Sequence, residues 1–207
     1  MLISTTDDSV QGPQWMECPQ IETDLPTLAF FYPLNELIIA ERRDDLHDLI
    51  GLSGVGYTVF NNKGQKVFLA VLEKQYKKFD IKIFNHYGNE VVHVRRPFHF
   101  CTKKVLVCAP PGNLVGSIKE IRTRWKTYVV KNRLEKDVLK IVPAGVFNYM
   151  YNIQLMYGGT VVGVIRKHCD VATLLDMKHF AISFPIELDV RDKAVLLGAC
   201  FTIGFQY

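Results

Sequence analysis

The stretch at residues 194–205, AVLLGACFTIGF, contains no charged side chain. Its apolar residues occupy every side of a helix, which predicts a helix that is buried all round. Twelve helical residues span about 18 Å, whereas the hydrocarbon core of a bilayer is about 30 Å thick. The sequence therefore predicts a core helix of a globular domain at about residues 192–205, with Asp192 as its N-cap.

A turn signal repeats along the chain before this helix. Gly64, Gly88 and Gly112 lie 24 residues apart. Turn-like runs with alternating or β-branched flanks recur at residues 61–64, 85–88, 109–113, 131–137 and 156–160. A unit of this length holds two strands, a turn and a connector, so the pattern predicts five hairpins. Chance spacing of glycines is the alternative, and the repeated alternation argues against it.

Five hairpins with further strands at either end give about twelve strands. Antiparallel sheets of this size close into a barrel or split into a sandwich. A barrel around the apolar helix accommodates both observations. We therefore predict a mainly β fold over residues 28–207, a roughly twelve-stranded antiparallel closed barrel around a buried C-terminal helix. Residues 1–27 are polar and interrupted by prolines, which predicts a flexible acidic arm.

Charge divides the chain unevenly. Residues 1–50 hold ten acidic and two basic side chains, whereas residues 62–140 hold 18 basic and 6 acidic ones. Six cations fall within 15 residues: Lys119, Arg122, Arg124, Lys126, Lys131 and Arg133. This pattern favours an anionic partner, namely lipid headgroups, nucleic acid or an acidic protein, with the arm as a contact for protein partners. The alternative is an arm that folds back on its own basic face.

The sequence lacks the motifs of common enzymes. It has no GxSxG, HExxH, P-loop or GxGxxG pattern, which argues against an enzyme. Its five cysteines form no CxxC pair, and the first 25 residues have neither a basic nor an apolar leader region, so no secretion signal is expected. Both observations predict reduced thiols on the cytosolic side of the membrane.

Several long motifs resemble one known family. Residues 180–205, FAISFPIELDVRDKAVLLGACFTIGF, resemble the C-terminal signature of the phospholipid scramblases. Further similar stretches are FFYPLNELII at 30–39, VVHVRRP at 91–97, APPG at 109–112 and EKDVLKIVPA at 135–144. The resemblance covers about residues 28–207 and implies the tubby-like fold.

The same resemblance implies a function. It is the ATP-independent, bidirectional, calcium-stimulated movement of phospholipids between leaflets, at the cytoplasmic face of membranes such as the plasma membrane. The six cations listed above would then contact lipid headgroups, at about 1 kcal/mol each near anionic lipid. A different class of function stays open, namely a soluble adaptor that binds anionic lipid or nucleic acid without scrambling.

The resemblance also places a calcium segment at residues 176–187. It implies Asp176, Phe180, Ile182 and Glu187 as the metal-binding positions. However, Lys178 stands where such a loop needs a carboxylate, and Ala181 stands where it needs glycine. We therefore predict weak or absent calcium binding, and we expect the double change Lys178→Asp with Ala181→Gly to restore it.

Family members carry a palmitoylated cysteine cluster after an Arg-Pro pair. Here Arg96 and Pro97 are followed by a single cysteine, Cys101. One acyl chain anchors a protein only marginally, so Lys103 and Lys104 would have to supply a second signal. The alternative is that Cys101 is a small buried residue.

Overall fold

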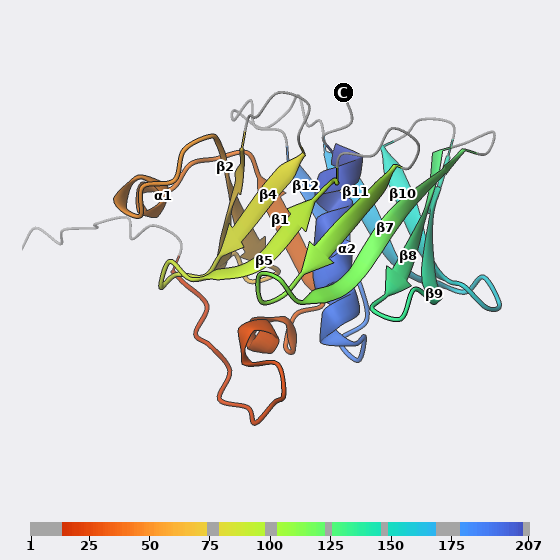
Figure 1. Ribbon diagram of the computed structural model, residues 1–207, viewed down its shortest axis with the longest axis horizontal. Coiled ribbons are helices and arrows are strands. Elements are labelled where there is room, and N and C mark those ends of the chain that lie inside the picture. The colour runs from red at the N-terminus through yellow and green to blue at the C-terminus, as the bar shows by residue number, and fades with distance from the viewer. Residues whose placement is uncertain are drawn as a thin grey trace, which may run out of the picture.

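The chain forms a barrel of twelve strands with a helix through its middle (Figure 1). The computed structural model describes residues 14–73, 79–97, 103–122, 126–145, 149–168 and 179–204. Its strands are β1 (Glu36–Ala40), β2 (Val55–Asn61), β3 (Lys66–Leu72), β4 (Asp80–Phe84), β5 (Glu90–Arg95), β6 (Lys104–Cys108), β7 (Leu114–Arg122), β8 (Lys126–Asn132), β9 (Asp137–Pro143), β10 (Met150–Leu155), β11 (Val161–His168) and β12 (His179–Ser183). Its helices are η1 (Pro26–Phe31), α1 (Asp45–Leu49) and α2 (Val190–Gly204). The predicted fold class is confirmed.

Every strand pairs antiparallel with its neighbours in sequence, and the first strand pairs with the last. The closing register runs from Glu36 opposite Ser183 to Ala40 opposite His179. Closure satisfies the backbone groups that an edge strand would expose. It also leaves one interior, which the inward side chains and α2 fill.

All five predicted hairpins are present, and an asparagine explains three of the turns. Asn61 Oδ1 accepts hydrogen bonds from the backbone N–H groups of residues 63 and 65, and Asn85 and Asn132 do the same at their own turns. Three residues after each asparagine the backbone turns left-handed, at Gly64, Gly88 and Glu135. The 24-residue period therefore reflects one turn design that is reused along the barrel.

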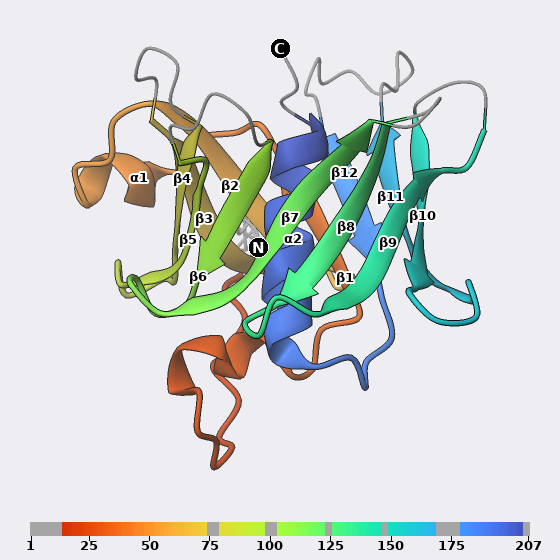
Figure 2. The same cartoon turned by 45° about the vertical axis from the view of Figure 1, so that its right-hand side comes forward.

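The two ends of the barrel differ in what they hold. The hairpin turns, η1 and the start of α2 lie at one end, called here the lower end (Figures 1 and 2). The opposite end, called the upper end, holds the last residues of β7, the first residues of β8 and the carboxyl end of α2. The helix thus runs through the barrel from the lower end to the upper end.

Helix α2 is enclosed as the sequence predicts. Leu196, Leu197 and Phe201 have no exposed surface. Gly198 faces β5 and β6, where an added Cβ would lie 2.9 Å from Val107 Cγ2. A larger residue at position 198 would therefore push the helix from the barrel wall.

The predicted N-cap is wrong by three residues. The helix begins at Val190, and Asp189 caps it by accepting a hydrogen bond of 2.8 Å from the N–H of Arg191. The backbone carbonyl of Asp189 also accepts from Lys193 N–H at 3.0 Å. Asp192 instead lies in the first turn of the helix. The apolar pattern alone predicts a start that is too late, because residues 191–193 are charged but already helical.

The described part of the predicted arm lies against the barrel. Met16 is 8% exposed and belongs to the core, and its N–H donates to the carbonyl of Lys66 at 2.8 Å. Lys66 N–H donates in turn to Gln14 O at 2.9 Å. Residues 14–18 are thus docked beside β3 rather than extended away from it, and residues 1–13 lie outside the described ranges.

Candidate functional site

The lower end of α2 contains a fully buried lysine. The ammonium of Lys193 donates to four backbone carbonyls: Phe31 at 3.1 Å, Tyr32 at 3.1 Å, Leu34 at 2.8 Å and Ile186 at 2.7 Å. Because an ammonium has three N–H donors, the four oxygens share them. Lys193 therefore joins the helix to the end of η1, to the approach to β1 and to the β12–α2 loop.

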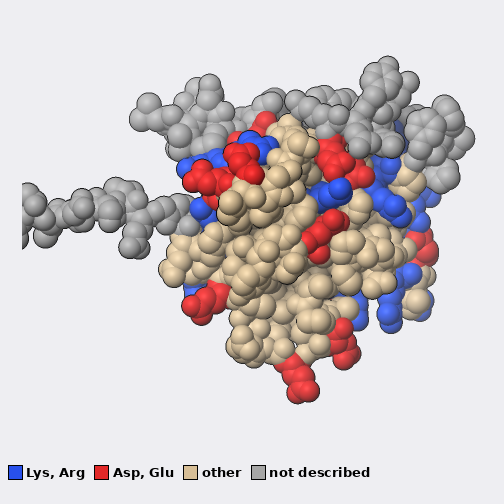
Figure 3. Space-filling model, turned by 60° about the vertical axis from the view of Figure 1, so that its left-hand side comes forward, with Lys and Arg blue, Asp and Glu red and all other residues tan. Residues whose placement is uncertain are grey.

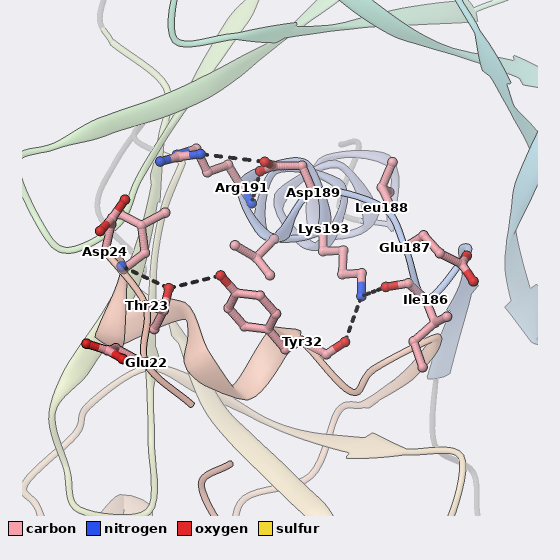
Figure 4. A pocket seen from close by; sticks show the side chains of 12 residues that line it. Glu22, Thr23, Asp24, Tyr32, Ile186, Glu187, Leu188, Asp189, Arg191 and Lys193 are labelled. Atoms are coloured by element: carbon pink, nitrogen blue, oxygen red, sulfur yellow. Dashed lines mark hydrogen bonds and ion pairs between the residues drawn. The ribbon is translucent and has the colours of Figure 1, made fainter. Parts of the chain in front are cut away.

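A cavity of about 450 Å³ lies beside this lysine (Figure 4). Residues 22–25 form one wall, residues 186–191 the other, and the Tyr32 ring and Lys193 lie between them. Thr23 Oγ1 and Tyr32 OH share a hydrogen bond of 2.9 Å across it. Four carboxylates line the cavity, namely Glu22, Asp24, Glu187 and Asp189. Its size suits a small molecule, but its charge disfavours a phosphate.

Burial shifts the pKa of two groups at this helix start. Burial, with a smaller effect of the neighbouring Asp189 charge, raises the pKa of Asp192 to about 6. Burial lowers the pKa of Lys193 to about 8, against a smaller opposing effect of Glu187. Both shifts follow from the cost of removing a charge from water.

The described part of the predicted calcium segment is a strand. Phe180 and Ile182 lie in β12, which pairs with β1 and β11, and their side chains are buried in the core. Alternate residues of a strand lie about 6.6 Å apart, whereas two oxygens that bind one Ca²⁺ lie within about 5 Å of each other. Positions 180 and 182 therefore do not converge on one ion through this geometry.

The remaining metal positions lie elsewhere. Glu187 is exposed in the β12–α2 loop and lines the cavity, and Asp176 lies outside the described residues. Within the described ranges, no group of three or more His, Cys, Asp or Glu side chains is arranged to hold a metal ion. Weak or absent calcium binding stays a prediction that this geometry supports.

The structure divides the six predicted headgroup cations between the two ends. Lys126 lies directly opposite Arg122 at the upper ends of β8 and β7. Lys119 lies three residues before Arg122 on β7, opposite Val129. Lys131 lies near the lower end of β8, about 17 Å along the strand from Lys126, and Arg133 follows in the turn after this strand. They therefore do not form one patch.

The upper-end and lower-end cations also differ in their surroundings. Lys131 forms an ion pair with Asp137 and donates to the carbonyl of Glu135. Lys119 is exposed. Of the other predicted positions, Arg124 and the acylation site Cys101 lie outside the described residues. The described cysteines include the buried Cys108, whose thiol pKa is raised by burial and which is therefore a poor nucleophile.

The outer wall carries mixed charge. Figure 3 shows red and blue side chains interspersed over a large uncharged area on the face that it presents. Elsewhere on the barrel Lys82 forms an ion pair with Glu73 at 2.6 Å, and His93 Nε2 lies 2.7 Å from Asp80 Oδ1. In the described part of the chain, no helix has the length and apolar character needed to cross a bilayer.

The structure defines a class of protein, namely closed twelve-stranded barrels with a buried C-terminal helix. Comparison with known proteins identifies the family within this class. The Scramblase family model matches residues 53–207, three quarters of the chain. This protein therefore belongs to the scramblase family.

Individual relatives agree with this assignment. Rat phospholipid scramblase 1 is 29% identical, over 95% of this chain and 67% of its own length. Human phospholipid scramblase 2 is 27% identical, over 95% of this chain and 75% of its own. Among solved structures, a protein of Arabidopsis thaliana superposes with a TM-score of 0.53 at 12% identity, covering 83% of this chain and 92% of that one. The last likeness supports the fold alone.

Proposed function

We propose that this protein is a phospholipid scramblase, which lets phospholipids cross between bilayer leaflets in both directions without ATP. The observation that carries the proposal is the family match, which runs from β2 to the end of α2 and so covers nearly the whole barrel. The relatives that match over most of the chain are named phospholipid scramblases. Movement of intact lipids needs no bond-making residues, so the protein acts through its contacts with the bilayer.

Cations supply the attraction to the membrane in this proposal. Each lysine or arginine near an anionic lipid surface contributes about 1 kcal/mol. We propose the cytoplasmic leaflet as the site of contact, because it carries most of the anionic lipid. Acylation of Cys101 would add a second anchor, since one acyl chain alone binds only marginally.

Reconstitution into vesicles tests the activity. Vesicles with a fluorescent phospholipid in both leaflets are treated with an impermeant reductant, which bleaches only the outer leaflet. A scramblase exposes the inner pool, so the signal falls below the half that protein-free vesicles retain. A signal that stays at the protein-free level would contradict the proposal.

Calcium dependence is measured in the same assay. We expect the rate with calcium to be close to the rate with a chelator, because β12 does not offer a loop for the ion. A strong calcium requirement, together with micromolar affinity by calorimetry, would overturn this expectation. The variant Lys178→Asp with Ala181→Gly serves as the comparison.

A second candidate is a lipid-binding module that does not scramble. The enclosure of α2 favours it, because Leu196 and Leu197 are fully buried and have no surface to offer to lipid. In this case the protein would sediment with anionic vesicles but leave the inner-leaflet fluorescence protected. Binding and scrambling are therefore measured on the same preparation.

A further inference from the structure

Several of the described inward positions at the upper end of the barrel carry cations. On β7 and β8, Ile118 lies opposite Val130, and both are core residues. Residues that lie opposite each other share a face of the sheet. Two steps further toward the upper end on the same face, Arg122 lies opposite Lys126. The inward face of these strands thus changes from apolar to basic as it reaches the upper end.

The neighbouring strands repeat this change. On β5 and β6, Val94 lies opposite Val107 in the core, so the inward face continues at Arg96 and Lys103 beyond the paired ends. On β11, Ile165 is a core residue and Lys167 is the next inward position. Cations at or just beyond the upper ends of β5, β6, β8 and β11 therefore lie on the inward face of the barrel.

Aromatic rings lie beneath two of these cations. The Arg96 guanidinium lies 5.5 Å from the Phe79 ring centroid, and Lys167 Nζ lies 5.9 Å from that of Phe180. Phe180 packs directly on the carboxyl end of α2, since an added Cβ on Gly204 would lie 2.6 Å from its ring. Lys167 therefore lies close to the end of the central helix.

Among the described residues at this end, one carboxylate pairs with a cation of the group. Glu120 faces the interior with a side chain that is 8% exposed, and it pairs with Lys103 at 2.9 Å. The side chains of Arg96, Lys103 and Lys126 are accessible to solvent. The carboxyl end of α2 carries the negative end of the helix dipole and has no basic residue in its own last turn. The described strand ends place cations on the same side of the barrel as this helix end.

We propose that this end of the barrel, the cationic mouth formed by Arg96, Lys103, Lys126 and Lys167 over Phe79 and Phe180, binds the phosphates of anionic phospholipid headgroups. Arginine and lysine bind phosphate oxygens, and the Phe79 and Phe180 rings position Arg96 and Lys167 through cation–π contacts. The inference rests on the proposed function in taking a phospholipid as the partner. To the proposed function it adds a binding site for the headgroups and an orientation of the barrel on the membrane, in which the axis of α2 points at the bilayer.

The lower end is the competing surface. It exposes large apolar side chains, including Tyr157 at 86% and Leu134 at 65%. However, the cavity there is lined by Glu22, Asp24, Glu187 and Asp189. Carboxylates are repelled by an anionic membrane, so electrostatics favours the cationic mouth.

Vesicle co-sedimentation with a charge-matched control tests the proposal. The mouth variant is Arg96→Gln with Lys167→Gln, and the control is Lys63→Gln with Lys136→Gln, two exposed cations in lower-end turns. We expect the mouth variant to bind phosphatidylserine-containing vesicles about 30-fold more weakly than the unmodified protein, from two cations at the membrane surface. The control should lose less than about threefold, because its charges lie beyond the screening length from the bilayer.

Further measurements separate the outcomes. Unchanged melting temperatures establish that both variants fold, and Arg96→Lys with Lys167→Arg should restore binding because it restores the charges. Equal binding by the mouth and control variants would overturn the cationic mouth, even if the protein scrambles. Loss of single-stranded DNA binding with vesicle binding intact would also overturn it, in favour of a nucleic-acid site. Mouth-dependent vesicle binding without scrambling would uphold the mouth and contradict the proposed function.

Discussion

Lys193 shows how one side chain holds several segments of this fold in place. Its four carbonyl partners come from two stretches of chain, residues 31–34 and Ile186, which are about 150 residues apart in the sequence. The burial of this lysine could have been predicted from the sequence. A helix that is apolar on every side leaves no exposed position for a charge that enters its first turn, so such a charge must find partners inside.

Replacement of this lysine should destabilise the protein strongly. Lys193→Met keeps most of the side-chain volume but leaves buried carbonyls without donors, so we expect a loss of about 3 kcal/mol in the free energy of unfolding. Urea denaturation measures it. Arg191→Met is the neighbouring control, with an expected change below about 0.5 kcal/mol, because that side chain is partly exposed. Equal effects of the two changes would contradict the role of the carbonyl contacts.

Asp192 gives stability a pH dependence of known sign. Its pKa in the folded protein is about 6, above the ordinary 3.8. Between these values the folded state binds the proton that the unfolded state has lost, so this group makes stability fall as pH rises from about 4 to 6.

The variant Asp192→Asn should therefore be more stable than the unmodified protein at pH 7, by about 1 kcal/mol, and equally stable at pH 4. Thermal unfolding at both pH values measures the difference. Asp189→Asn is the comparison, because an asparagine preserves the N-cap. A gain that is the same at both pH values would show that charge burial is not its cause.

At the scale of elements, the turns were predictable and the docked segments were not. At Asn61, Asn85 and Asn132, an asparagine and a left-handed residue three positions later define the turn locally. The positions of these three hairpins could therefore be predicted from the local sequence and its spacing. By contrast, α1 has only five residues and η1 six, too few for a periodic signal. The docking of residues 14–18 depends on Lys66, which no local pattern connects with them.

The turns also offer a test by exchange of their left-handed residue. Glu135 has φ of 59° where the equivalent positions are glycines. Glu135→Gly should raise the free energy of unfolding by about 0.5 kcal/mol, because the relief of strain exceeds the added chain entropy and the lost exposed pair with Lys104. Gly64→Ala should lower it by about 1 kcal/mol, since φ is 74° there while open space surrounds the new methyl group. Opposite signs in urea denaturation are the expected result.

At the scale of the whole molecule, sequence reasoning located the barrel and its helix but not the arrangement of charge. The six cations looked like one cluster because they are close in sequence. A strand that crosses the whole barrel separates Lys126 from Lys131, and closure instead brings Lys126 to the same end as Arg96 and Lys167. Only the register of several strands reveals such a grouping, because its members lie up to 71 residues apart.

The enclosure of α2 is the feature on which the interpretation of the molecule depends. If the helix is the core of the barrel, Leu197→Asp places an unpaired charge where no surface is exposed. The cost of several kcal/mol is comparable to the whole stability of a typical domain, about 5–15 kcal/mol. We therefore expect the variant to be insoluble or unfolded by circular dichroism. Leu134→Asp, at a side chain that is 65% exposed, should change the melting temperature little. A folded Leu197→Asp protein with an unchanged melting temperature would instead mean that the helix leaves the barrel, as a membrane anchor must.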